Sequence, residues 1–341
     1  MYHGRFHGNH YEIGFRWGSR LAKHANYILN NIPFHITEER LRFAQYCLPI
    51  YQEFFPEILE EIQGIADGQS CDVTLLQGLL FSIYAMPPSC QCSCFAVSNE
   101  NTILLGRNSD FLTAIKKNNL NVIYHFSTDS FSFTGNTTAF VQMEDGVNEK
   151  GLAVGLTSVY PPSIRPGINA GLLLRFFLEK CSSVEEVIFH LDRLPVSSAQ
   201  TFTVADSFGN LVVLESYCGQ TVKISPSGER PYVCATNRFH SSALSAMNSE
   251  KIDDWQAEPR YQTMTRFLEA HAKEMRLEEA KGLLRGEYGF LCQYDRTTGK
   301  DTVWSVLYDL KQNRIYRTEK NPTRTPFKPD TRFPILAHNR V

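Results

Sequence analysis

The sequence predicts an α+β protein in which a helical segment precedes two antiparallel sheets with helices outside them. Three observations support this prediction. Apolar residues recur at helical spacing through most of the first ninety residues, the pattern changes to short strands at Cys92, and helical stretches return between later strands. With 341 residues and 43% hydrophobic content, the chain is long enough to bury a large core.

The first segment carries four helical patterns separated by Asp or Gly breaks and ended by a Pro-Pro pair. These helices are expected from residue 11 onward and at residues 41–51, 58–65 and 75–84. Sheet patterns begin only at the cysteines that follow. We therefore predict a boundary at Cys92, with a helical leader or propeptide segment over residues 1–91 and a second domain over residues 92–341.

Beyond Cys92 the pattern is that of short strands joined by turns. The expected strands cover residues 95–98, 102–106, 121–127, 139–144, 152–159, 200–205, 211–216, 232–236, 302–308 and 314–318. Helices are expected at residues 168–180, after a capping box of Ser182 and Glu185, and at residues 259–284. The first two of these helices are expected to cover one sheet.

The strand that carries Cys92 turns at residues 99–101 and returns onto Arg107-Asn108-Ser109-Asp110. Antiparallel pairing places residue 92 opposite roughly residues 107 to 109, so its thiol lies near a guanidinium and a carboxylate. A slip of one residue exchanges the two faces of a strand, and the sequence leaves open whether Arg107 or Asp110 shares the face of Cys92. We interpret Cys92 as a catalytic nucleophile.

Charge and composition exclude several classes of partner. The net charge is −2 with no basic stripe or polybasic segment, so we expect neither nucleic-acid nor membrane binding. The amino terminus has no signal-peptide pattern, and the longest apolar runs are too short or interrupted to cross a bilayer. Nine cysteines, an odd count, favour free thiols over a disulfide framework, and we expect a cytoplasmic protein.

Cys92-Ser93-Cys94-Phe95, followed by Gly106-Arg107-Asn108-Ser109-Asp110, resembles the signature of the linear-amide C–N hydrolases. These N-terminal-nucleophile (Ntn) enzymes include choloylglycine hydrolase, penicillin V acylase and isopenicillin N acyltransferase. Further similar motifs lie at residues 146–152, 205–215 and 235–239. Residues 11–18 and 61–68, ahead of the cysteine, resemble the acyltransferase branch. The resemblance implies a four-layer αββα sandwich.

The resemblance also implies a mechanism. Cleavage of the Gln91–Cys92 bond would free an α-amino group beside the thiol, and because their ordinary pKa values both lie near about 8, one can accept the other's proton. Arg107 would favour the thiolate, Asp110 would accept a hydrogen bond from the α-amino group, and Asn148 and Asn237 would donate to the oxyanion. The resemblance therefore implies catalytic roles for Cys92, Arg107, Asp110, Asn148 and Asn237.

The implied substrate is a small N-acyl compound with a non-peptide linear amide, and acyl-CoA is a candidate acyl donor. No cofactor or metal is implied. Water or an amine could accept the acyl group from the Cys92 thioester, and the sequence does not separate hydrolysis from transfer. It also leaves the oligomeric state open between a monomer and a homo-oligomer.

The chain departs from the family pattern in places. Gln91 precedes the nucleophile where glycine is expected, Arg238 stands where histidine is common, and Cys292-Gln293-Tyr294 replaces a Cys-x-His pattern. A second arginine, which some relatives carry late in the chain, cannot be located from the sequence.

Other interpretations of the same residues remain. Cys90 or Cys94 could be the nucleophile or simply pack, and the three thiols could bind a soft metal. Asn148 could be only a turn residue, since asparagine suits left-handed backbone. His125 or His240 could pair with a cysteine. At the level of function, the alternatives are a non-catalytic small-molecule-binding protein with Cys92 uncleaved and a thiol redox or metal-binding protein.

Overall fold

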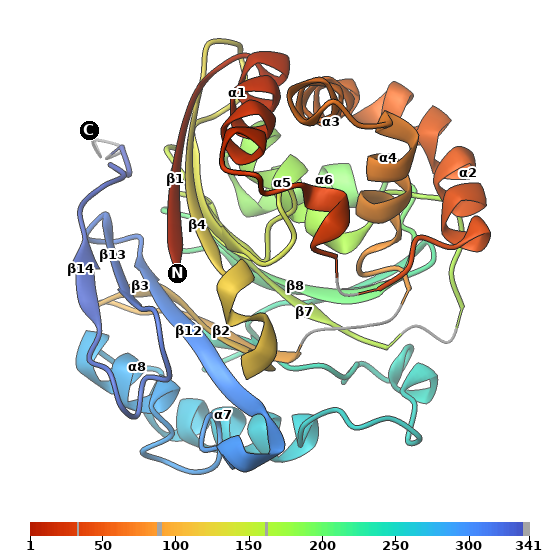
Figure 1. Cartoon of the computed structure of the whole chain (residues 1–341). Coiled ribbons are helices and arrows are strands. Elements are labelled where there is room, and N and C mark those ends of the chain that lie inside the picture. The colour runs from red at the N-terminus through yellow and green to blue at the C-terminus, as the bar shows by residue number, and fades with distance from the viewer. Residues whose placement is uncertain (33, 87–90, 161–162, 337–341) are drawn as a thin grey trace.

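The computed structural model describes residues 1–32, 34–86, 91–160 and 163–336 (Figure 1). It contains two sheets. The eight-stranded sheet has the order β1 (Tyr2–Gly8), β4 (Leu120–Phe126), β5 (Phe133–Thr137), β6 (Asp145–Asn148), β7 (Ala153–Ser158), β8 (Ala199–Ala205), β9 (Leu211–Tyr217), β10 (Gln220–Ile224). The six-stranded sheet has the order β11 (Tyr232–Ala235), β2 (Gln91–Ser98), β3 (Ile103–Leu112), β12 (Lys300–Asp309), β13 (Arg314–Thr318), β14 (Lys328–Asp330).

Helices lie on the outer sides of the two sheets, as Figure 1 shows. Over the eight-stranded sheet lie α1 (His10–Lys23), α2 (Glu38–Phe54), α3 (Pro56–Gln69), α4 (Val73–Ser82), α5 (Ala170–Lys180) and α6 (Val184–Leu191). Over the six-stranded sheet lie α7 (Ala257–His271) and α8 (Leu277–Leu284). Within the described ranges, four 3₁₀ helices connect other elements: η1 (Ile28–Asn30), η2 (Thr113–Asn118), η3 (Ser245–Met247) and η4 (Arg296–Thr298).

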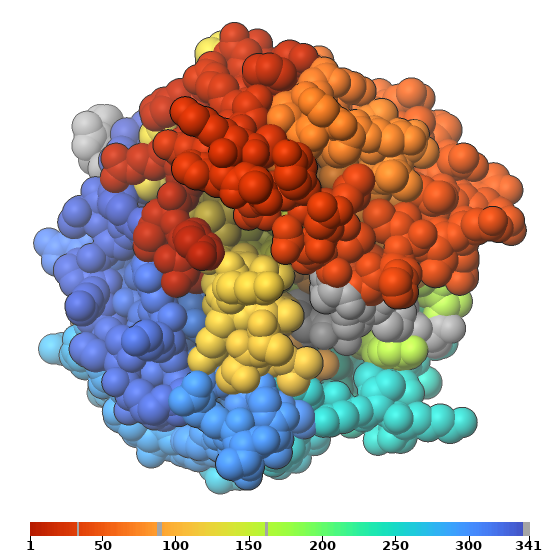
Figure 2. Space-filling view, in the orientation of Figure 1, coloured from red at the N-terminus to blue at the C-terminus, as the bar shows by residue number. Residues whose placement is uncertain are grey.

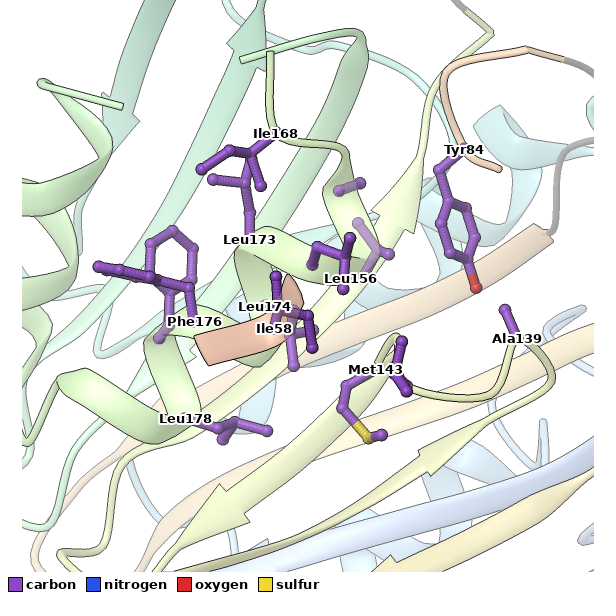
Figure 3. Packing of buried hydrophobic residues seen from close by; sticks show 14 of the residues in the cluster. Ile58, Tyr84, Ala139, Met143, Leu156, Ile168, Leu173, Leu174, Phe176 and Leu178 are labelled. Atoms are coloured by element: carbon purple, nitrogen blue, oxygen red, sulfur yellow. The ribbon is translucent and has the colours of Figure 1, made fainter. Parts of the chain in front are cut away.

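The apolar side chains form distinct buried clusters because the strands alternate their faces. In β2, Cys94 and Ala96 pack in a cluster with residues of both sheets, whereas Phe95 and Val97 pack with α7 and α8. A third cluster joins the first six helices to the eight-stranded sheet. Figure 3 shows part of it, with Leu173 and Leu174 of α5 near other buried apolar side chains. The predicted α+β class is confirmed.

The first segment of the chain is part of the eight-stranded sheet. Strand β1 pairs in parallel with β4 from Tyr2 opposite Leu120 to Gly8 opposite Phe126. The sequence did not predict this strand. Its pairing partner lies more than one hundred residues away, and its histidines and glycines give no apolar alternation.

Two glycines allow α1 and α3 to approach each other closely. A Cβ atom on Gly14 would lie 2.1 Å from the carbonyl oxygen of Glu61, and one on Gly64 would lie 2.2 Å from that of Tyr11. Any larger residue at either position would therefore push the helices apart. The start of α1 is fixed by a capping box, in which the side chain of Asn9 accepts from the backbone N–H of Glu12 at 2.8 Å.

Three sequence predictions of secondary structure are wrong. The strand expected at residues 139–144 is a series of buried turns between β5 and β6. The N-cap of α6 is Ser183 rather than Ser182, and its hydroxyl accepts from the N–H of Glu186 at 3.3 Å. The helical stretch expected at residues 259–284 is broken between α7 and α8. Among the described residues, none of the helices combines the length and apolar character needed to cross a bilayer.

Candidate active site

The structure defines the register of the hairpin formed by β2 and β3, which the sequence had limited to a few possibilities. Cys92 pairs with Ser109, and Gln91 pairs with Asp110, around a loop of residues 99–102. Because side chains alternate along a strand, Arg107 shares the face of Cys92, whereas Asp110 projects from the opposite face. The register therefore answers the question that the sequence left open: Arg107, and not Asp110, lies on the same face as Cys92.

Arg107 contacts the sulfur of Cys92 directly. Its Nη2 atom lies 2.7 Å from the Sγ atom, and both side chains are fully buried. Gly155 of β7 makes room for this contact, since a Cβ atom there would lie 2.5 Å from the sulfur of Cys94 and 3.3 Å from Cδ of Arg107. A guanidinium in this position favours the thiolate over the thiol.

The other side of the guanidinium is held by carboxylates. Nη1 of Arg107 donates to Asp145 at 2.9 Å, and Nε donates to the carbonyl oxygen of Leu156 at 3.0 Å. Asp145 also accepts from Trp304 Nε1 at 2.9 Å and from the hydroxyl of Tyr308 at 2.7 Å. This fully buried carboxylate is therefore paired and hydrogen-bonded, which burial of a charge requires.

A second carboxylate, Glu144, lies 3.6 Å from Nη2 of Arg107. Burial raises the pKa of Glu144, although Arg107 and hydrogen bonds from Thr138 oppose that shift. Its Oε2 atom also accepts from the hydroxyl of Ser109, the residue paired with Cys92, at 3.3 Å. Glu144 thus lies on the same side of the hairpin as the sulfur.

Asn237 contacts the backbone of Cys92. Its Oδ1 atom accepts from the Cys92 N–H at 2.8 Å, and its Nδ2 atom donates to the carbonyl oxygen of Ser158 at 2.7 Å. The side chain stands just after β11, which is next to β2 in the sheet. The predicted residues Cys92, Arg107 and Asn237 are therefore in direct contact.

The structure also places Arg260 of α7 at this site. Its Nη1 atom donates to the carbonyl oxygen of Cys92 at 2.6 Å, and its Nη2 atom donates to Oδ1 of Asn237 at 3.0 Å. Nη1 lies 3.7 Å from Asp110. The side chain is fully buried. The sequence did not reveal this arginine, because it lies 168 positions after Cys92 in a helix with no local motif.

Asp110 lies behind the strand rather than beside the sulfur. Its carboxylate accepts from the hydroxyl of Thr302 at 2.5 Å and from the hydroxyl of Tyr294 at 2.9 Å. Burial raises the pKa of Asp110 to about 6, against the opposing effects of Arg260 and these two donors. Tyr294 is the residue found where the family pattern has histidine, so this departure from the pattern supplies a hydrogen bond to Asp110.

Asn148 has a different set of partners. Its Nδ2 atom donates to the carbonyl oxygens of Leu178 at 3.0 Å and Cys181 at 2.7 Å, while its Oδ1 atom accepts from the N–H groups of Lys150 and Leu152. These are the contacts of a residue that shapes a turn and joins it to α5. A catalytic role for Asn148 remains a prediction that these contacts do not support.

The alternative residues have other environments. Cys90 lies outside the described residues. Cys94 packs between the sheets, and burial raises the pKa of its thiol to about 12. His240 stacks on Tyr261 with ring centroids 3.4 Å apart, and burial lowers its pKa to about 4. His125 stacks on His7. In the described ranges, His, Cys, Asp and Glu side chains form no group of three or more that could hold a metal ion.

A cavity of about 890 Å³ adjoins the site, and both Gln91 and Asp110 line it. Most of its wall is apolar and comes from β1, α1, the segment between α1 and α2, and the residues that follow α4. The apolar lining includes Phe6, Trp17, Leu21, Ile28, Ile32, Leu79, Ile83, Met86, Phe111, Ile115 and Phe140.

A family model described as acyl-coenzyme A:6-aminopenicillanic acid acyl-transferase matches residues 97–324. The match covers most of the chain and shows that the protein is an Ntn-type enzyme acting on linear amides. More particularly, the chain belongs to the acyl-coenzyme A:6-aminopenicillanic acid acyl-transferase family. The predicted resemblance is confirmed. The match starts just after Cys92.

The beta-alanyl-dopamine/carcinine hydrolase of Drosophila melanogaster is 22% identical over 376 aligned positions, which cover 96% of this chain and 95% of that protein. Two solved structures have TM-scores of 0.46 and 16% identity. The alignment with penicillin V acylase from Agrobacterium tumefaciens covers 72% of this chain and 88% of the acylase chain. The N-acylethanolamine-hydrolyzing acid amidase ortholog of Caenorhabditis elegans covers 64% and 93%. A conjugated bile acid hydrolase mutant from Clostridium perfringens has a TM-score of 0.43 and 15% identity, covering 73% and 99%.

Proposed function

We propose that this protein is a self-processing amidohydrolase or acyltransferase whose nucleophile is the thiol of Cys92, acting on a small N-acyl compound. The observation that carries this proposal is the 2.7 Å contact between Arg107 Nη2 and Cys92 Sγ, with Asn237 on the backbone nitrogen of the same residue. A fixed cation next to the sulfur supplies the electropositive environment of a reactive thiol.

In the processing step, the sulfur of Cys92 attacks the carbonyl carbon of Gln91. A C–S bond forms, the C–N bond to Cys92 breaks, and the departing nitrogen takes a proton to become an α-amine. Water then hydrolyses the thioester and leaves a carboxylate on Gln91 and a free thiol on Cys92. Asn237 already accepts from the departing nitrogen, and Arg260 holds the Cys92 carbonyl, so both fix the strand on which the bond breaks.

In turnover, the new α-amine accepts the thiol proton while the sulfur attacks the substrate amide. Nδ2 of Asn237 is the side-chain donor proposed for the oxyanion, since its carbonyl end is held by Arg260. The substrate amine leaves with a proton, and water or an acyl acceptor releases the acyl group from Cys92. Asp110 is proposed to stabilise the protonated α-amine from behind the strand.

We further propose that the helix, sheet, sheet and helix layers form the four-layer αββα sandwich of Ntn hydrolases. Residues 1–91 would be the leader and residues 92–341 the catalytic domain. Pairing of β1 with β4 supports a leader that stays folded against that domain after the cut.

The binding-protein alternative is favoured by one observation, which is that the side chain of Cys92 is fully buried in this structure. The two proposals differ in whether the sulfur becomes acylated. Purified protein mixed with an N-acyl substrate and quenched in acid should carry one acyl group on the peptide that begins at Cys92. The Cys94→Ala protein should carry the same group, whereas absence of the adduct from both, without amide cleavage, would support the binding protein.

A further inference from the structure

The cavity next to Cys92 is large and lined mostly by apolar side chains. Its volume of about 890 Å³ is near the upper end of the range of about 300 to 1,000 Å³ typical of small-molecule sites. Phe6, Trp17 and Ile83 are among the lining residues, and the charged side chains Arg20, Lys117 and Asp253 that also line it are exposed. The wall is therefore mostly apolar, with these three charges at the solvent side and the buried carboxylate of Asp110 at the end next to Cys92.

The position of Gln91 shows which half of a substrate this cavity faces. Gln91 and Met86, on the amino side of the proposed scissile bond, line the cavity, whereas Cys92 is not among the lining residues. In the proposed processing step, Gln91 is the first acyl group that the sulfur carries. A substrate acyl group attached to the same sulfur would occupy the same side, so it would extend into the cavity.

The side chain of Gln91 is a poor permanent occupant of this space. Its Oε1 atom is buried and has no hydrogen-bond partner among the described residues. A buried, unsatisfied amide oxygen costs free energy, because it has lost its bonds to water without gaining a protein partner. Departure of the Gln91 end after the cut would remove this cost and leave the apolar wall to a substrate.

We propose that the cavity binds an apolar acyl group of fatty-acid size, so that the substrates are amides of medium- to long-chain fatty acids. This inference rests on the proposed function. Asp110, the buried carboxylate of the lining, already accepts from the hydroxyls of Thr302 and Tyr294 and lies 3.7 Å from Arg260. The ammonium group of a charged acyl group such as β-alanyl would therefore lie among apolar side chains such as Phe6, Trp17 and Ile83, which costs free energy. Discrimination between acyl groups is therefore assigned to their apolar surface.

The leader supplies much of this specificity. Phe6, Trp17, Leu21, Ile32 and Ile83 all lie ahead of Cys92, and these segments meet the segment of η2 at the centre of the face seen in Figure 2. A processed enzyme that lost residues 1–91 would lose most of the apolar wall. Chain-length selectivity should thus depend on the retained leader.

The test measures kcat/KM of the processed enzyme for acetyl, hexanoyl, decanoyl and tetradecanoyl amides of one amine, together with the β-alanyl amide. We expect a rise of about fourfold for each added methylene until the cavity is full. The β-alanyl amide should be turned over no better than the acetyl amide. A flat or falling series, or a preference for the β-alanyl amide, would overturn the inference.

Two variants locate the effect in the cavity. Ile83→Trp fills the cavity and should shorten the preferred acyl chain. Ile50→Trp, a matched change in α2 away from the lining, should keep the profile of the unmodified enzyme. If both variants give the unmodified profile, the acyl group binds elsewhere.

A binding measurement separates this inference from the proposed function. Trp17 and Trp255 line the cavity, so decanoate should change the tryptophan fluorescence of the uncut Cys92→Ala chain, and Ile83→Trp in that chain should weaken binding. If decanoate binds but no amide turnover depends on Cys92, the binding role of the cavity is supported and the proposed role of Cys92 as nucleophile is contradicted. If turnover depends on Cys92 but shows no chain-length preference and decanoate does not bind, only the proposal that the cavity binds an apolar acyl group is contradicted.

Discussion

The guanidinium of Arg107 joins the thiol of Cys92 to the carboxylate of Asp145, with Nη2 2.7 Å from Sγ and Nη1 2.9 Å from Oδ2. The planar guanidinium makes these contacts from two separate nitrogens in a fixed geometry, whereas the ammonium group of lysine is a single point charge on a flexible stem. The cation near the sulfur is thus fixed in place by a carboxylate that other donors hold in turn.

Arg107→Lys should keep the charge but lose the fork. We expect the protein to fold, because Asp145 keeps its bonds from Trp304 and Tyr308, and amide turnover to fall by about 100-fold. The pH at which iodoacetamide labels Cys92 of the processed enzyme should rise. Arg40→Lys, a buried arginine of α2, serves as the control, and equal turnover in the two variants would contradict the assigned role of Arg107.

The raised pKa of Asp110 should make the stability of the protein depend on pH. Because burial raises its folded pKa to about 6, above the ordinary value of 3.8, its contribution is fully present below about pH 4 and is lost as pH rises through about 6. The difference corresponds to about 3 kcal/mol. In the uncut Cys92→Ala chain, Asp110→Asn should remove this decline in the urea unfolding free energy between about pH 4.5 and 7. Asp129→Asn, at an exposed carboxyl, should keep it.

Substitution of Asn237 and of Asn148 should have different effects, the first on turnover and the second on stability. Asn237→Ala is expected to lower kcat by about 10² to 10³, the usual effect of losing one oxyanion donor. Asn148→Ala should lower the unfolding free energy by about 1 to 3 kcal/mol, because buried carbonyl and N–H groups lose their partner, while turnover per folded molecule is kept. Loss of turnover in a fully folded Asn148→Ala enzyme would restore the catalytic role predicted from sequence.

The leader is held by a buried ion pair as well as by β1. Glu61 of α3 accepts from Nη2 of Arg175 in α5 at 2.7 Å and from the hydroxyl of Tyr124 at 2.8 Å. Glu61→Ala should lower stability by about 3 to 5 kcal/mol, since it breaks a buried pair. In size-exclusion chromatography of processed protein, its two fragments should separate at a lower urea concentration than in the exposed-site control Glu60→Ala. Identical elution of the two variants would argue against a role of the Glu61–Arg175 ion pair in holding the leader.

The part of the candidate site that lies on the hairpin of β2 and β3 was predictable from local sequence patterns. The turn at residues 99–102 limited the partner of Cys92 to a few positions, and the observed partner, Ser109, is among them. The face was undetermined because loop length sets the register, and sequence alone did not fix that length. Arg260 and Tyr294 escaped prediction because their contacts with the hairpin depend on tertiary packing across more than 160 positions.

The wrong strand at residues 139–144 has a different cause. Its alternation of apolar and polar residues is typical of a strand, but Glu144 turns its side chain back to accept from the N–H and hydroxyl of Thr138. These local bonds stabilise a turn. Helices with strong caps and apolar faces, such as α1, were predictable because their signals are contained in consecutive residues.

Intact-mass measurement of the purified chain tests the central claim most directly. The unmodified chain should give two fragments, residues 1–91 and residues 92–341, and Cys94→Ala should give the same cut with its own mass change. Cys92→Ala should stay whole and lack amidase activity. A single uncut chain in the unmodified protein, or amide turnover that survives in Cys92→Ala, would contradict the account.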